Sequence, residues 1–143
     1  MTTSLDLCLS HGRHEQAVSA VMIRDPKTMT TDVTVGEVKA VLRNDHVHMV
    51  LLTEAGILVG TLVREDVHDA PDAGRALPLA VLPGRTIPPS ASAEEARGAL
   101  VATGARRLAV VDGHGVLLGL LCLKRRRAGF CSDQDIRSRA VAP

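Results

Sequence analysis

Residues 28–67 of this chain are repeated, loosely but in order, at residues 86–126. Thr34–Glu37 in the first copy matches Ser92–Glu95 in the second, and both pairs have the spacing of a helix capping box. Two glycines also recur in the same order, Gly56 and Gly60 in the first copy and Gly115 and Gly119 in the second. A duplication of this length predicts two lobes related by an approximate twofold axis, and the seam between such lobes is a common ligand site.

Each copy predicts the same order of elements. A short extended piece, 28–30 or 86–89, precedes the capped helix, whose apolar residues recur at helical spacing. Two apolar strands follow on either side of a glycine turn, and the predicted ranges are 47–52 and 57–62, then 108–111 and 116–121. Gly56 and Gly115 are expected to supply positive φ at the turns. A last helix is expected near Arg64 and again near Lys124.

The order β-α-β-β-α predicts an α+β fold. One copy alone would bury only one face of a three-stranded sheet, so the two copies are expected to pack against each other about a pseudo-twofold axis. We expect an N-terminal arm at 1–20, a first repeat at 21–72, a second repeat at 73–129 and a C-terminal tail at 130–143. A short amphipathic helix is expected at the end of the arm, from Glu15 into Val21.

The composition argues against several classes of protein. The chain has one Phe and neither Tyr nor Trp, whereas base-stacking readers of nucleic acids depend on aromatic platforms. The formal net charge is +1, so no global field draws the chain to DNA or to a membrane. The longest apolar run, Val116–Leu123, is too short to span a bilayer, and the N-terminus lacks the pattern of a signal peptide.

The three cysteines follow no metal or disulfide spacing, which fits a reducing cytosol and predicts a cytoplasmic protein. We interpret Cys122 as a small buried residue and Cys131 as an exposed residue of the tail. His46 and His48 would share one face of a strand, but no third ligand at a fixed spacing supports them, so no metal site is predicted. The sequence also contains no nucleophile motif and no glycine-rich phosphate loop, so no enzyme activity is predicted.

Several stretches resemble the cystathionine-β-synthase-type (CBS) domain. They are residues 86–96, Met22 to Met29, Leu108–Asp112 and the closing run Gly60–Asp66. The resemblance covers roughly residues 20–127 and follows the predicted order of elements. It implies a stand-alone tandem CBS pair, also called a Bateman module, which acts as a regulatory sensor and forms a homodimer. It further implies an adenine nucleotide (AMP, ADP or ATP) or S-adenosylmethionine bound in a cleft between the repeats, and a protein partner that the sequence does not identify.

The resemblance also implies roles for individual residues. Asp66 occupies the position of the family's closing aspartate, which binds both ribose hydroxyls, and two carboxylate oxygens suit a vicinal diol. The family's hydroxyl residue three positions earlier is replaced by Val63, so one contact is lost. The same two positions in the second copy are Cys122 and Arg125. An arginine cannot accept a hydrogen bond from ribose, so the second cleft is expected to be empty or to bind another ligand.

The phosphate contacts that the resemblance implies fall on Arg106 and Arg107, whose forked guanidinium groups suit phosphate oxygens. His48 holds the matching position in the first copy, and the backbone of Thr61–Val63 is expected near the base. Simpler readings stay open: Asp66 also suits the first turn of a helix, and the two arginines also suit a solvated loop.

Two alternative functions remain. The chain could be a ligandless scaffold for protein interaction or dimerisation, since Val63, Cys122 and Arg125 depart from the family pattern. It could also associate with nucleic acid through the basic run 124–127. However, the side chains of four adjacent helical residues point in different directions around the helix axis and would not form one basic face. A solvated helix or a dimer contact is the favoured interpretation of that run.

Overall fold

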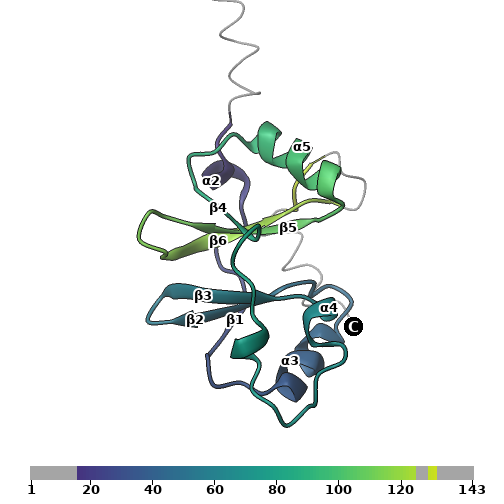
Figure 1. Cartoon of the computed structure of the whole chain (residues 1–143). Helices are drawn as coiled ribbons and strands as arrows, with labels where there is room; N and C mark the ends of the chain where they lie inside the picture. The colour runs from purple at the N-terminus through teal and green to yellow at the C-terminus, as the bar shows by residue number, and fades with distance from the viewer. Residues whose placement is uncertain (1–15, 125–128, 132–143) are drawn as a thin grey trace, which may run out of the picture.

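The computed structural model describes residues 16–124 and 129–131 of the 143-residue chain. Figure 1 shows two lobes stacked through their sheets, with the helices on the outer faces. The first lobe has strands β1 (Thr28–Met29), β2 (Val50–Glu54) and β3 (Ile57–Leu62), in that order across the sheet. The second lobe repeats this order with β4 (Thr86–Ile87), β5 (Arg107–Val111) and β6 (Leu117–Cys122). In each sheet the first pair of strands is parallel and the second is antiparallel, so the predicted α+β repeat is confirmed.

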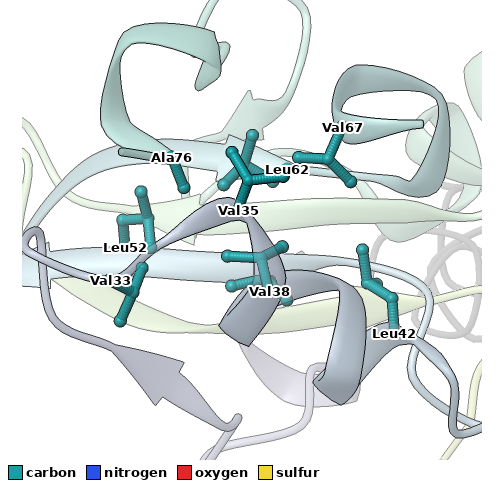
Figure 2. Packing of buried hydrophobic residues seen from close by; sticks show 9 residues of the cluster. Val33, Val35, Val38, Leu42, Leu52, Leu62, Val67 and Ala76 are labelled. Atoms are coloured by element: carbon teal, nitrogen blue, oxygen red, sulfur yellow. The ribbon is translucent and has the colours of Figure 1, made fainter. Parts of the chain in front are cut away.

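Helices cover the outer face of each sheet. The first lobe carries α3 (Val35–Leu42) and the single-turn α4 (Arg64–Val67), and the second carries α2 (Val18–Val21) and α5 (Ala93–Thr103). A 3-10 turn, η1 (Leu77–Leu79), belongs to residues 68–85, which join α4 to β4 and which we call the linker. Figure 2 shows how residues of α3 and α4 point at the sheet; the labelled side chains include Val35, Val38, Leu42, Leu52, Leu62 and Val67.

The two predicted capping boxes form to different extents. At the start of α3 the Glu37 amide donates to Thr34 Oγ1 at 3.1 Å, and the Thr34 amide donates to Glu37 Oε1 at 2.8 Å. At the start of α5 the structure keeps one half of the box, the bond from the Glu95 amide to Ser92 Oγ at 3.2 Å. Both helices therefore begin where the hydroxyl residues predicted.

The strand boundaries and the histidines need correction. Strand β2 begins at Val50 rather than at residue 47, because pairing with β3 starts only at Val50, opposite Leu62. His46 and His48 therefore precede the strand and do not share a face of it.

The turn of the first hairpin has positive φ at Ala55 (54°) and Gly56 (81°). In the second hairpin Gly115 has φ 83°. The predicted positive φ of Gly56 and Gly115 is confirmed. The last predicted helix, near Lys124, falls partly on residues 125–128, outside the described residues.

The segment that precedes the first strand of each repeat lies on the sheet of the other repeat. Ile23 pairs with Leu120 of β6 through backbone bonds of 2.8 and 2.9 Å, and Val81 pairs with Thr61 of β3 through bonds of 3.0 and 2.9 Å. Helix α2 follows the same rule, since the Val18 amide donates to the Ala91 carbonyl at 2.8 Å. The two lobes are thus tied together by exchanged segments as well as by packing.

The hairpins of the two lobes also bond to each other. The Leu58 amide donates to the Gly115 carbonyl at 2.9 Å, and the Leu117 amide donates to the Gly56 carbonyl at 3.0 Å. The twofold axis relates Leu58 to Leu117 and Gly56 to Gly115, so it converts one of these hydrogen bonds into the other. The buried side chains of Met49, Leu51, Leu58 and Ala109 fill the space between the sheets. The predicted pseudo-twofold arrangement is confirmed.

Candidate functional site

A cavity of about 510 Å³ lies between the repeats, and we call it the first cavity. Its walls come from His48 and Met49 before β2, residues 63–65 at the start of α4, Gly84 and Arg85 of the linker, and residues 103–107 between α5 and β5. Both repeats and the linker therefore contribute to it. Its volume lies within the range of about 300–1,000 Å³ that is typical of small-molecule sites.

Four of the six predicted ligand residues line this cavity: His48, Val63, Arg106 and Arg107. They come from distant parts of the chain, and the exchanged packing of the lobes brings them together. Thr61 and Asp66 are not among the lining residues. Thr61 is fully buried, and its hydroxyl donates to the Val81 carbonyl at 2.6 Å.

Asp66 lies just beside the cavity, in the first turn of α4. Its Oδ2 accepts the backbone N–H of Val63 at 2.8 Å, so the carboxylate satisfies a free amide at the helix start. Arg85 holds the same carboxylate, with Nη1 at 3.1 Å from Oδ2 and Nη2 at 3.4 Å from Oδ1. Arg85 Nη1 also donates to Thr61 Oγ1 at 3.2 Å. The predicted ribose acceptor is therefore paired with an arginine that also lines the cavity.

The sequence interpretation missed Arg85. It lies one residue before β4, outside the stretches that carry the family resemblance. A weak signal existed, because Lys27 occupies the matching place one residue before β1. A basic residue at both places in a duplicated unit would have marked the position.

The first cavity is strongly cationic. Arg64, Arg85, Arg106 and Arg107 line it, and Glu65 is the one carboxylate residue among the described lining residues. Backbone carbonyls hold two of these arginines: Arg64 Nη2 donates to the carbonyls of Leu42 and Asn44, and Arg106 Nε donates to that of Leu123 at 3.1 Å. A carbonyl fixes a guanidinium without cancelling its charge, so the cavity is suited to anions.

A second cavity, of about 300 Å³, occupies the corresponding place in the other half of the molecule. It is lined by Ile23, residues 25–27, residues 46–49, Arg107, Leu120 and Cys122. It shares His48, Met49 and Arg107 with the first cavity. Burial raises the pKa of the Cys122 thiol to about 12, against the opposing effect of the nearby Arg107 charge. Arg125, the other residue predicted to differ in this half, lies outside the described residues.

Cys131 is buried, with 1% of its surface exposed, which corrects the prediction that it is an exposed tail residue. Cys122 is equally buried, as predicted. Within residues 16–124 and 129–131, no three side chains of His, Cys, Asp or Glu are grouped as metal ligands. The same part of the chain contains no helix long and apolar enough to cross a membrane.

The fold and the cavity define a two-lobed module in which duplicated β-α-β-β-α units enclose a cationic cleft. The family model of the CBS domain matches residues 18–72 and 82–125, and the chain belongs to the CBS domain family as a tandem pair. The first match begins inside the segment that we expected to be an N-terminal arm. It includes α2, which packs on the second lobe.

Solved structures share this fold. The CBS pair domain of a putative Mg²⁺ transporter from Shewanella oneidensis is 17% identical with a TM-score of 0.69, over 91% of this chain and 75% of that one. A CBS domain protein from Pyrobaculum aerophilum, complexed with AMP, is 22% identical with a TM-score of 0.66, over 89% of this chain and 100% of that one.

The cytosolic domain of the Mg²⁺ channel MgtE, in complex with ATP, is 19% identical with a TM-score of 0.65. The match covers 87% of this chain but 49% of that one, so this chain spans about half of the MgtE domain. At these identities the likeness establishes the fold. The curated proteins include no sequence that matches this chain.

Proposed function

We propose that this chain is a regulatory module that binds an adenine nucleotide in the first cavity, with the phosphates held by arginines. The observation that carries the proposal is the set of four lining arginines, two of them fixed by backbone carbonyls. The AMP and ATP complexes of proteins with the same fold support the choice of ligand class.

Arg106 and Arg107 are the proposed phosphate ligands. They lie next to each other at the start of β5, and Arg107 is 7% exposed. Fixed guanidinium groups bind phosphate oxygens in pairs and lose little side-chain entropy on binding. His48 and Arg64 lie on the same cavity, with His48 Nδ1 and Arg64 Nη1 3.4 Å apart. We assign them to the outer phosphates of ADP or ATP.

Asp66 is the proposed ribose acceptor, and its use requires Arg85 to move. The phosphates attract the Arg85 guanidinium into the cavity, which removes its bonds to Asp66. Oδ1 and the second lone pair of Oδ2 can then accept from the ribose hydroxyls, while Oδ2 keeps the Val63 amide. The base then lies near the backbone of Thr61–Val63 and the apolar wall made by Met49 and Val63.

The charge of the cavity also selects among the adenosine ligands. A nucleotide brings negative phosphates to the arginines, whereas S-adenosylmethionine brings a sulfonium cation. We therefore place AMP, ADP and ATP ahead of S-adenosylmethionine. No enzyme activity is proposed, because CBS pairs are in general regulatory rather than catalytic.

Regulation requires that the ligand bind one arrangement of the two lobes better than another. Because the first cavity takes its walls from both repeats and the linker, a bound nucleotide contacts all three and would change the position of one repeat relative to the other. We propose that a cytoplasmic protein partner binds one of these arrangements in preference to the other. We also propose that the chain acts as a homodimer.

The ligandless scaffold is the second candidate function. It is favoured by the Asp66–Arg85 pair, since the carboxylate already has partners without any ligand. In this interpretation the Asp66–Arg85 ion pair only stabilises the contact between the linker and the first repeat.

Isothermal titration calorimetry separates the two candidates. ATP, ADP, AMP, adenosine and S-adenosylmethionine are titrated into the wild-type chain, an Arg106→Gln variant and an Arg97→Gln variant. Arg97 is the matched control, because it pairs with Glu94 on the surface of α5 and does not line the first cavity. Nucleotide binding that Arg106→Gln weakens and Arg97→Gln preserves supports the sensor. Absence of heat from every ligand, with no rise in melting temperature, supports the scaffold.

A further inference from the structure

Two buried cysteines contact each other beside the second cavity. The Cys122 and Cys131 Sγ atoms are 2.7 Å apart, and each residue is 1% exposed. Both are free cysteines in the structure, and Ile23 completes their buried cluster. Two thiols at this separation are in position for a bond between their sulfur atoms.

The backbone holds the two cysteines in this position. Residues 129–131 lie along the end of β6, where Leu123 and Phe130 form an antiparallel bridge. The Cys131 amide donates to the Cys122 carbonyl at 2.7 Å, and the Lys124 amide donates to the Gly129 carbonyl at 2.7 Å. The cysteines are therefore opposite each other on paired backbone segments, and their proximity does not depend on a side-chain rotamer alone.

A small reagent would reach the pair from the second cavity when the chain opens locally. Cys122 lines the second cavity, together with the polar residues Lys27 and His46. Separation of residues 129–131 from β6 would break only a few backbone bonds, and local openings of this kind expose buried groups without global unfolding. Because burial raises the pKa of the Cys122 thiol to about 12, we expect the reaction to be faster at alkaline pH.

We propose that Cys122 and Cys131 form a reversible intramolecular disulfide by exchange with a low-molecular-weight disulfide. One cysteine, as its thiolate, attacks a sulfur of the reagent RSSR, forms a mixed disulfide and releases RS⁻. The second cysteine attacks the protein sulfur of that mixed disulfide and releases the second RS⁻. The two released thiolates take up the two thiol protons, so one dithiol and one RSSR give one protein disulfide and two RSH.

The bond would change the second cavity and its surroundings. It would fasten residues 129–131 covalently to β6 and remove a free thiol from the cavity wall. Ile23 packs in the same cluster and pairs with Leu120, so the exchanged segment of the first repeat lies next to the bond. The oxidation state of the pair is thereby linked to the junction of the two lobes.

The test uses the full chain and a Cys8→Ser variant, because Cys8 is the third cysteine. Both proteins are equilibrated at alkaline pH with graded ratios of oxidised to reduced glutathione, quenched, alkylated and digested with trypsin without reduction. We expect peptide 108–124 to be joined to peptide 128–137, with a mass about two hydrogens below the sum of the two thiol peptides. The yield of this joined peptide should be the same in both proteins. The same series in urea gives the reference for the unfolded chain.

The folded protein should form the joined peptide at a ratio of oxidised to reduced glutathione about tenfold lower than the unfolded chain requires, because the fold holds the sulfur atoms together. Dithiothreitol should restore both thiols. Mixed disulfides with glutathione in place of the joined peptide would overturn the proposal, as would equal ratios for the folded and unfolded chains. Neither result depends on nucleotide binding.

Discussion

The Arg85 guanidinium donates to both carboxylate oxygens of Asp66, at 3.1 and 3.4 Å. The pair joins the linker between the repeats to the first turn of α4, and its side chains are 23% and 15% exposed. Asp66 is the residue that the family resemblance makes the ribose acceptor. In the proposed site a ribose takes the place of Arg85 on this carboxylate, and this exchange would link ligand binding to the position of the linker.

The Asp66→Ala change should lower the free energy of unfolding by about 1–3 kcal/mol, because it leaves the Val63 amide and the Arg85 guanidinium without their partner. Urea denaturation measures the change. Asp72→Ala is the control: Asp72 pairs with Lys39, but its side chain is 68% exposed, so its loss should matter much less. Equal effects of the two variants would contradict the structural role of Asp66.

The Arg85→Ala change should weaken ATP binding by about tenfold or more, because a charge-assisted bond to phosphate is lost. Adenosine has no phosphate, and Asp66 is no longer covered, so adenosine affinity should stay the same or rise. Calorimetry with both ligands measures the difference. A parallel loss of affinity for ATP and adenosine would mean that Arg85 shapes the cavity rather than binding phosphate.

The Gly60→Ala and Gly119→Ala changes should each cost about 1–3 kcal/mol of stability through overpacking. A Cβ at Gly60 would overlap the Cβ of Ala80, and one at Gly119 would lie 2.5 Å from the Ile23 carbonyl oxygen. Both glycines lie where an exchanged segment crosses a strand. Gly98→Ala, in the exposed part of α5 with no atom within 4 Å of the new Cβ, should instead stabilise by about 0.5–1 kcal/mol. If only one of the Gly60→Ala and Gly119→Ala changes lowered the stability, the two crossings would not be structurally equivalent, which would contradict the account.

The Asp112 carboxylate should stabilise the fold in a pH-dependent way. Hydrogen bonds from the amides of His114 and Val116, at 2.8 and 3.0 Å, lower its pKa. A group with a lowered pKa stabilises the folded chain above its unfolded pKa, about 3.9, and the effect is lost as the pH falls through the folded pKa. The melting temperature of Asp112→Ala should therefore be below that of the wild type at pH 7 and approach it in acid. Asp45→Ala, in an exposed turn, is the charge-matched control.

Much of this architecture could be predicted from the sequence, because the signals are local. Thr34 and Ser92 mark the starts of α3 and α5, and Gly56 and Gly115 mark the two hairpin turns. The duplication then led to the pseudo-twofold axis, which the paired bonds between the hairpins confirm.

The remaining features depend on tertiary contacts with no fixed spacing in the chain. The pairing of Ile23 with Leu120 joins residues on different repeats, and nothing in either stretch indicates the exchange. Arg85 pairs with Asp66 because the linker folds back over β3, where Val81 bonds to Thr61. The contact of Cys122 with Cys131 required the fold of residues 129–131 along β6, which the interpretation of that stretch as a tail did not foresee.

A crystal structure of the chain grown with ATP tests the central claim most directly. The account predicts ATP in the first cavity, with phosphates within hydrogen-bonding distance of Arg106 and Arg107 and with the Arg85 guanidinium withdrawn from Asp66. Density for ATP elsewhere, or an empty cavity at a saturating ATP concentration with the Asp66–Arg85 pair intact, would contradict it.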